Sequence, residues 1–395
     1  MAAARSGPLR NCRLLDLTRA LAGPYCAMML GDLGADVIKI EPPEGDMTRF
    51  TGPNTRSDTD NFFGGYFGSI NRNRRGMVLD LREEADRQIF LRLVDTADAV
   101  LENFRPGVME RFGLGYEVLA ERNPRLVYAA IRGFGDPRTG ESPYADWPAF
   151  DVVAQAMSGV VSITGTGEGE FLRAGPSIGD LYPATVAALG LCAALVHSRE
   201  TGEGQFMDVA MYDALVALCE APVYRYSYMG AVTVPTGNSH PQLAPFDIYP
   251  TEDGACAIAA PTNIHWPTLC ALIGRPELAE DVRTRDNRDR VANRDFVRDV
   301  MCEWTTARTT AQVVEQLAGH VPVGPVNDVY DVFHDPHVAA RQMLVSVEHP
   351  GSDRPVVYPN SPIKYTATPA GVHRRAPKLA EHQAEILAEL EQDPP

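Results

Sequence analysis

Residues 13–41 read RLLDLTRALAGPYCAMMLGDLGADVIKIE, and this stretch decides the fold class. Residues 13–18 form a short apolar run typical of a buried strand, and residues 36–41 form a second one. Between them, residues 23–33 have the apolar spacing of a helix, and Gly34 follows as a stop signal. A strand, a crossover helix and a second strand predict parallel pairing within an α/β fold.

The same alternation continues to about residue 135. The pattern predicts further strands at 77–80, 99–102 and 126–131. It predicts further helices at 82–93 and 116–122. We interpret this half as a Rossmann-type parallel sheet with helices on both faces.

The second half has a different pattern of predicted elements. It contains a long apolar helix predicted at 181–199, a strand at 205–210 and a helix at 211–228. A loop rich in Pro, Gly and Ser at 230–245 then precedes an α+β segment. Because 395 residues exceed the size at which a single core usually stops growing, about 250–300 residues, we expect two domains.

Composition excludes several function classes. The 36 Lys+Arg against 52 Asp+Glu give a net charge of −16, which argues against a nucleic-acid binder. We find no uncharged apolar run of about 18 residues and no secretory leader, so we predict no membrane span. Seven cysteines without a Cys-x-x-Cys pair indicate neither disulfides nor zinc, and we expect a cytoplasmic protein.

Two cofactor classes are also disfavoured. The turn after the first strand reads TRALAGP at 18–24, without the glycines that let a backbone approach the pyrophosphate of NAD. His334 and His337 lie in a loop interrupted by proline rather than on a metal-binding helix. We therefore predict no NAD and no metal.

Clustered arginines stand out in an acidic chain. Arg72, Arg74 and Arg75 precede the strand at 77–80, while Arg105 and Arg111 follow the strand at 99–102. Guanidinium groups suit phosphates, so these clusters could hold an anionic ligand. The alternative is that they are solvated surface arginines paired with carboxylates, and spacing alone leaves both interpretations open.

Asp180 is the most informative carboxylate. It lies between Gly179 and Leu181, directly before the long apolar helix. It can be an ordinary helix N-cap. It can equally be an accessible carboxylate that attacks an acyl group, with helix amides nearby.

The chain resembles the class III CoA-transferases, the CaiB/BaiF type. This family includes formyl-CoA:oxalate, carnitine and succinyl-CoA:dicarboxylate CoA-transferases, with α-methylacyl-CoA racemases as relatives. The resemblance rests on LDLTRALAGPYCAMMLGDLGADVIKIEPPEGD (15–46), NRNRRGMVLDL (71–81), LENFRPGVMERFGLGYEVL (101–119), FDVVAQAMSGVVSITG (150–165), GDLYPATVAALGLCAAL (179–195) and TGEGQFMDVAMYDA (201–214). These segments are spread over most of the chain.

The resemblance implies an interlocked homodimer of two threaded, ring-like chains. Each chain would have a large Rossmann-like domain and a smaller α+β domain. We expect the large domain to begin with 1–200, a linker at 201–230, the small domain at 231–325, and a return linker with the end of the large domain at 326–395.

The resemblance also implies the chemistry, an acyl-CoA:carboxylate CoA transfer with succinyl-CoA as the candidate donor and small carboxylic acids as acceptors. Asp180 would be the nucleophile, passing through an aspartyl anhydride and an aspartyl-CoA thioester. The positions that match contacts to CoA are Arg74, Asn103 and Arg111, with the backbone around Ile40 and Glu41 near the adenine.

Departures from the relatives bear on the substrate. The racemases have a histidine where this chain has Phe150 and a glutamate where it has Thr262, so a 2-methylacyl-CoA racemase is the weaker alternative. The oxalate enzymes have glutamine at Leu21 and tyrosine at Phe150, so a larger or partly apolar acid is expected. His240 and Gln242 are candidate contacts to the acceptor. A non-catalytic CoA-binding homodimer is the third alternative.

Overall fold

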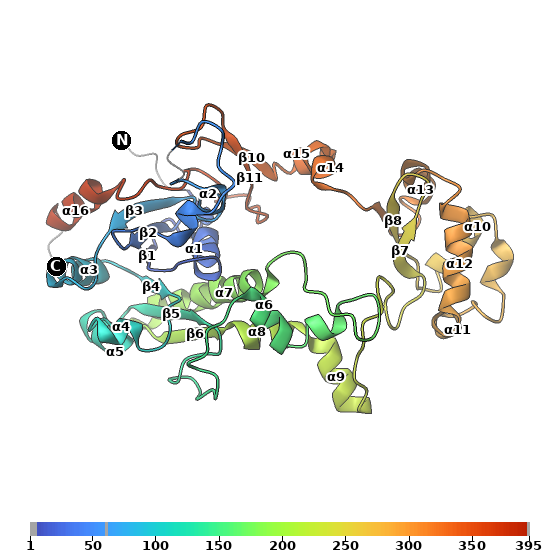
Figure 1. Cartoon of the computed structure of the whole chain (residues 1–395), viewed down its shortest axis with the longest axis horizontal. Helices are drawn as coiled ribbons and strands as arrows, with labels where there is room; N and C mark the ends of the chain where they lie inside the picture. Colours follow the sequence, from blue (N-terminus) through green and yellow to red (C-terminus); the bar gives the residue numbers. More distant parts are fainter. Residues whose placement is uncertain (1–5, 60–61, 393–395) are drawn as a thin grey trace. The chain divides into compact units, whose positions relative to one another are not determined.

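A computed structural model describes residues 6–59 and 62–392 of the chain. The chain divides into two compact units (Figure 1). Unit 1 comprises Met1–Val161, Arg173–Met229 and His337–Pro395, and unit 2 comprises Ser162–Leu172 and Gly230–Pro336. Unit 1 is therefore completed by the last part of the chain.

Unit 1 is built on a six-stranded sheet with the order β3-β2-β1-β4-β5-β6, in which all neighbours pair in parallel. The strands are β1 (Arg13–Asp16), β2 (Asp36–Glu41), β3 (Arg74–Val78), β4 (Ala99–Glu102), β5 (Val127–Arg132) and β6 (Phe206–Ala210). This is the strand order of a Rossmann fold, as the alternation of strands and helices predicted.

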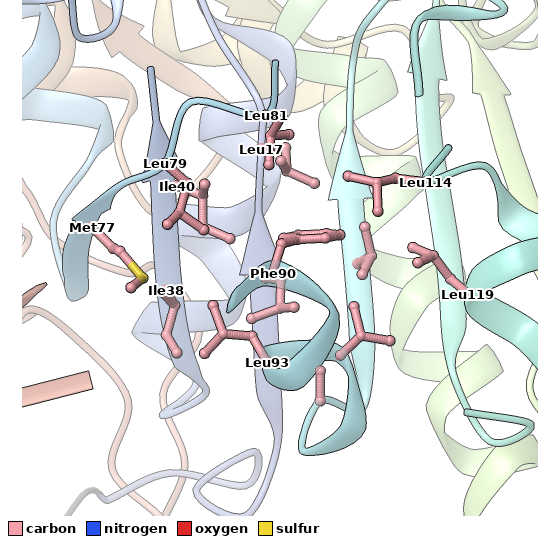
Figure 2. Close-up of a cluster of buried hydrophobic side chains, with 14 of the residues drawn as sticks. Leu17, Ile38, Ile40, Met77, Leu79, Leu81, Phe90, Leu93, Leu114 and Leu119 are labelled. Atoms are coloured by element: carbon pink, nitrogen blue, oxygen red, sulfur yellow. The ribbon is translucent and has the colours of Figure 1, made fainter. Parts of the chain in front are cut away.

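Helices cover both faces of this sheet. One layer consists of α1 (Ala22–Asp32) and α7 (Ile178–Thr201), which pack against each other, with α6 (Asp151–Met157) and α8 (Met211–Leu218) beside α7. The opposite layer contains α3 (Glu84–Asp95), α4 (Val108–Arg111), α5 (Tyr116–Arg122) and α16 (Gln383–Gln392). Figure 2 shows the core under this second layer, where Phe90 and Leu93 of α3 meet Ile38 and Ile40 of β2.

The remaining elements of unit 1 are short. They are η1 (Met47–Phe50), α2 (Gly65–Ile70), η2 (Val161–Ile163), α9 (Glu220–Met229), α15 (Pro336–Ala340) and the antiparallel pair β10 (Leu344–Val347) and β11 (Val356–Pro359), with α15 and η2 at its boundaries with unit 2.

Unit 2 is a smaller α+β assembly. Its antiparallel sheet consists of β7 (Phe246–Pro250), β8 (Ala255–Ala259) and β9 (Val323–Pro325). Its helices are α10 (His265–Leu272), η3 (Pro276–Ala279), α11 (Asn287–Ala292), α12 (Arg294–Thr305), α13 (Thr310–Leu317) and α14 (Val329–His334). Trp266, Leu269 and Met301 are fully buried at its core.

One expectation needs correction. The segment 201–230, expected as a linker, contains β6, which is a strand of the main sheet, together with α8 and α9. Helix α7 is long and apolar enough to cross a membrane by length and composition, although no such segment was expected. That observation is weak evidence for a membrane span, because buried core helices pass the same test, and Ala187, Leu191 and Leu195 of α7 are buried.

Candidate active site

The strand order places a switch point between β1 and β4. The chain builds β1, β2 and β3 outward in one direction, then returns to place β4 on the other side of β1. Ligands of open parallel sheets bind beyond the carboxyl ends of the strands at such a point. The two loops that meet there follow β1 and β4, and they contain Arg19 and Asn103.

Two cavities lie at this point. The outer cavity, of about 330 Å³, is lined by Ile40 and Glu41 at the end of β2 and by residues that follow β2 and β3, including Arg82. The Asp180 cavity, of about 240 Å³, is lined by Leu21, Asn103, Ile131, Trp147, Phe150, Asp180 and Met211, among others. Arg19 and Phe104 line both cavities, so the two are direct neighbours.

Asp180 lies within the first turn of α7 rather than at its cap. The helix begins at Ile178, and the N-cap is Ser177, whose side chain makes no capping hydrogen bond. The Asp180 side chain is half-buried and lines the cavity. The N-cap interpretation of Asp180 is therefore wrong, and its carboxylate is directed at a cavity instead.

Asp151 supplies the missing cap from the neighbouring helix α6. Its Oδ1 accepts a hydrogen bond from the Gly179 amide at 2.8 Å and another from Gln155 Nε2 at 2.7 Å. Gln155 is fully buried, and its Oε1 accepts a bond from the Ala174 amide at 2.9 Å. A Cβ on Gly179 would lie 2.6 Å from the Asp151 carbonyl oxygen, so only glycine permits this close approach. The network fixes the turn that presents Asp180.

The surroundings raise the pKa of Asp180 to about 7. Burial is the larger cause, and the negative charge of Asp151 adds to it. A carboxylate that ionises near neutral pH is a recurrent property of catalytic groups.

Tyr66, which the sequence did not single out, lies in the electrostatic field of Asp180 but outside the set of residues that line the two cavities. Burial and the charges of Asp180, Asp46 and Asp151 raise the pKa of its phenol to about 12, which places Tyr66 in the electrostatic field of Asp180. It lies on α2, a six-residue helix rich in glycine and aromatic residues that has no clear apolar spacing. Tyr66 follows Gly64-Gly65, and that dipeptide was the available signal.

A buried ion pair supports the loop after β4. Arg132 Nη2 lies 2.7 Å from Glu102 Oε1 and 3.0 Å from Asp136 Oδ2. Glu102 Oε2 also accepts a hydrogen bond from the Phe104 amide at 2.6 Å. Burial raises the pKa of Glu102 to about 7 despite the Arg132 charge. This carboxylate holds the loop that separates the two cavities.

Only some of the residues predicted to contact CoA line a cavity. Ile40 and Glu41 line the outer cavity, although the Glu41 carboxylate is occupied by Arg49 at 2.6 and 2.8 Å. Asn103 lines the Asp180 cavity. Arg111 is exposed at the end of α4, and it is outside the set of residues that line the described cavities.

Arg74 requires a different interpretation. Its side chain is fully buried, with Nη1 2.9 Å from Asp16 Oδ2 and Nη2 hydrogen-bonded to the Pro24 and Ile70 carbonyls. Arg72 pairs with Asp32 at 2.6 Å and Arg75 with Asp36 at 2.7 Å, and both are also buried. The cluster at 72–75 is therefore neither a docking site in this structure nor a solvated surface. The arginines that line the outer cavity are instead Arg19 and Arg82, and Arg82 follows the predicted strand at 77–80.

The predicted acid-binding residues fall in both units. Leu21 is buried and Phe150 is exposed, and both line the Asp180 cavity. His240 and Gln242 lie in unit 2, where the Gln242 amide donates to His240 Nδ1 at 3.1 Å and the His240 ring contacts Phe246. Among the described residues, no group of three or more His, Cys, Asp or Glu side chains is placed to hold a metal ion.

Known proteins match this chain over nearly its whole length. A family model described as CoA-transferase family III matches residues 9–383. The succinyl-CoA:mesaconate CoA-transferase of Haloarcula hispanica is 47% identical over 383 residues, which cover 97% of this chain and 96% of that protein. The succinate–glutarate CoA-transferase of Agrobacterium fabrum is 37% identical, covering 98% and 96%. A solved CaiB/BaiF family protein from Brucella suis has a TM-score of 0.85 at 35% identity, covering 98% of this chain and 100% of that one.

The named relatives move CoA between an acyl-CoA and a carboxylate, and the matches extend over nearly the whole chain. CoA thioesters are accordingly substrates of this enzyme. The chain is a CoA-transferase and belongs to CoA-transferase family III.

Proposed function

We propose that this enzyme transfers CoA from succinyl-CoA to a second dicarboxylic acid, with Asp180 as the covalent nucleophile. The observation that carries the proposal is the position of Asp180, a half-buried carboxylate in a cavity at the switch point of a parallel sheet. The outer cavity adjoins it, so a long thioester has room for its nucleotide end beside the reacting end.

The reaction would proceed by four acyl transfers. A carboxylate oxygen of Asp180 attacks the succinyl-CoA carbonyl carbon, the C–S bond breaks, and a mixed anhydride and CoA thiolate form. The thiolate attacks the Asp180 acyl carbon, which releases succinate and leaves an Asp180–CoA thioester. The acceptor carboxylate displaces the thiolate to form a second anhydride. The thiolate then attacks the acceptor acyl carbon, which yields the new thioester and restores the Asp180 carboxylate.

The environment of Asp180 suits this sequence. Every step exchanges an oxygen and a sulfur nucleophile at an acyl carbon, so no net proton is taken up. Leu21, Ile131 and Met211 give the cavity apolar walls. Such walls limit access of water, which would otherwise hydrolyse the anhydrides.

The residues that form the cavity walls also support the proposed class of acceptor acid. Leu21, Trp147 and Phe150 favour an acid with a carbon skeleton, and Arg19 and Arg105 offer guanidinium groups for its second carboxylate. The relatives named for mesaconate and glutarate have acids of this kind as substrates. No observation favours a racemase, because Phe150 supplies no base beside Asp180.

The covalent route is tested by trapping. The enzyme is mixed with succinyl-CoA, quenched with hydroxylamine or borohydride, and digested for mass spectrometry. We expect a modification on the peptide that contains Asp180, and we expect its loss together with transfer activity in Asp180→Asn. Asp213→Asn, an exposed carboxylate on α8 that lines neither of the two site cavities, is the matched control and keeps both. An active Asp180→Asn variant without any adduct would refute the proposal.

The acceptor is tested separately with a panel of acids assayed against succinyl-CoA. Dicarboxylic acids of four and five carbons, mesaconate and glutarate among them, should be transferred faster than oxalate or short monocarboxylic acids. Preference for oxalate would contradict the proposed acceptor class while leaving the Asp180 chemistry intact.

A further inference from the structure

The loop between β1 and α1 is held in a strained conformation at the site. Ala20 has a φ of 63°, in the left-handed region that a residue with a Cβ rarely adopts. Arg19, Ala20 and Leu21 form part of the wall of the Asp180 cavity. Strain of this kind persists only where the surrounding structure enforces it.

Asn103 provides the enforcing contact from the loop after β4. Its Oδ1 accepts a hydrogen bond from the Arg19 amide, and its Nδ2 donates to the Arg19 carbonyl, both at 2.8 Å. The two polar backbone groups immediately before Ala20 are thereby fixed. The Arg19 guanidinium also lies over the Phe104 ring, 5.3 Å from its centre, which ties the same two loops together.

The residue before Arg19 is held as well. Lys39 is fully buried, and its Nζ donates to the Thr18 carbonyl at 2.9 Å. The Thr18 amide in turn donates to Asp16 Oδ1 at 3.0 Å. With the polar backbone groups of Thr18 and Arg19 fixed before Ala20, and the Leu21 carbonyl after it accepting from the Tyr25 amide at 2.8 Å, the chain has little freedom to relax at Ala20.

We propose that Asn103 is a positioning residue, which clamps Arg19 and thereby maintains the left-handed Ala20 turn that shapes the cavity wall beside Asp180. Its oxygen and one of its two amide hydrogens are committed to Arg19, so its main action is through the loop rather than on CoA. The readout is CoA transfer itself, so the test stands whether or not Asp180 is the nucleophile.

A double-mutant cycle between Asn103→Ala and Ala20→Gly tests the clamp. Asn103→Ala should lower kcat by about tenfold or more, because small displacements at a site reduce rates by up to about a hundredfold. The KM for the CoA thioester should change by less than about threefold, since the clamp acts on the wall rather than on the ligand. Ala20→Gly in that background should recover part of kcat, because glycine adopts a positive φ without a steric penalty.

Two matched controls separate positioning from general stability. Asn123 is also an amide clamp, donating to the Val94 and Ala97 carbonyls at 2.9 Å, and it lies outside both cavities. Asn123→Ala should lower thermal stability without lowering kcat per folded molecule. Ala380 has a φ of 57° and also lies outside the cavities, so Ala380→Gly should not recover kcat in Asn103→Ala.

The opposite kinetic pattern would overturn the proposal. If Asn103→Ala raises the KM for the thioester tenfold at constant kcat, and Ala20→Gly recovers nothing, Asn103 contacts CoA directly. Should Asn103→Ala fail to fold, Asn103→Asp keeps the acceptor for the Arg19 amide and loses the donor to the Arg19 carbonyl. That variant should show a smaller loss of kcat, again partly recovered by Ala20→Gly, and absence of recovery there equally refutes the clamp.

Discussion

Asp180 combines two properties that oppose each other at neutral pH. A nucleophilic carboxylate must be ionised, whereas burial and the Asp151 charge favour its protonated form and raise its pKa to about 7. We therefore expect kcat/KM for CoA transfer to rise with pH through a midpoint of about 7 and to level off above it. The measurement is a pH–rate profile with saturating acceptor.

The contribution of Asp151 can be isolated in the same profile. Asp151→Asn keeps an oxygen for the Gly179 amide and removes the negative charge, so the midpoint should move to lower pH. Burial remains, so the midpoint should stay above 3.8, the ordinary value for aspartate. Asp213→Asn should leave the midpoint in place, and an unmoved midpoint in Asp151→Asn would show that the two carboxylates are not coupled.

The same raised pKa means that the ionised form of Asp180 destabilises the folded protein at high pH. Because its folded-state pKa is raised, protonation of Asp180 stabilises the folded protein fully below about pH 3.8, and this contribution is lost as pH rises through about 7. Asp180→Asn should thus stabilise the protein at pH 8 by roughly 1–3 kcal/mol and by much less at pH 5. Urea unfolding at the two pH values measures this difference.

The control for this comparison is a carboxylate without such surroundings. Asp299→Asn, exposed on α12, should change the free energy of unfolding by less than about 0.5 kcal/mol at either pH. If Asp180→Asn is less stable than the parent at pH 8, ionisation of Asp180 does not destabilise the folded protein, and the prediction is wrong.

At the scale of elements, the entry into α1 depends on a glycine. A Cβ on Gly23 would lie 2.3 Å from Thr18 Cβ and 2.4 Å from its Cγ2. Thr18 cannot yield readily, because Asp16 and Lys39 hold its amide and carbonyl. Gly23→Ala should therefore lower the free energy of unfolding by about 2–3 kcal/mol and displace α1 from the cavity, with a loss of transfer rate.

Gly190 on α7 is the matched glycine for this test. A Cβ there would come within 2.7 Å of the Met207 terminal methyl group, which is the far end of a flexible side chain. Alanine is also the better helix former by about 0.8–1.0 kcal/mol, so Gly190→Ala should be nearly neutral or stabilising. Equal losses in the two variants, measured by urea unfolding, would show that the contact with Thr18 is not decisive.

The elements also show how far the sequence predicts the structure. Strands at 36–41 and 99–102 and the helix at 116–122 have the predicted bounds, because each is a local pattern between clear stop signals. Asp180 was found from its neighbours alone, and Leu21, Asn103 and Phe150 from the family resemblance; all four line one cavity.

What the sequence did not predict depends on contacts between distant segments. Arg75 belongs to an edge strand and pairs with Glu385 at 3.0 Å and Glu389 at 2.5 Å, more than 300 residues away. No local sequence pattern predicts that the end of the chain packs against this strand. The hydrogen bond from the Gly179 amide to Asp151 likewise could not be predicted from the sequence, because it joins two helices that only the fold brings together.

For the whole molecule, the surface of unit 1 points to a second copy of the chain. Helix α9 has no buried residue, and Tyr226, Tyr228 and Met229 are 62%, 87% and 69% exposed. On α7, Leu189 is 72% exposed. A ten-residue helix gains little stability without packing, and apolar surface of this extent marks protein interfaces. The resemblance implies that the partner is an identical chain, and we predict that a second copy covers this surface symmetrically.

We expect light scattering after gel filtration to give about twice the chain mass of 43.1 kDa. Replacing Tyr226 and Tyr228 together with glutamate should weaken this dimer, because it would bury two charges at the interface. Ile264→Glu is the matched control, since Ile264 is 78% exposed but lies in unit 2, away from α9 in sequence. A parent protein with the mass of one chain at all concentrations would contradict the dimer.

The interlocking that the resemblance implies makes a stricter prediction than dimerisation alone. Two ring-like chains threaded through each other cannot separate without opening one ring, so dissociation requires at least partial unfolding. Tagged and untagged homodimers mixed under native conditions should therefore form no mixed dimer over days, at any dilution. Mixed dimers should appear after the two are unfolded and refolded together, in the 1:2:1 ratio of random pairing. Mixed dimers formed natively within hours would show that the chains associate face to face, and that the return of the chain to unit 1 at His337 does not enclose its partner.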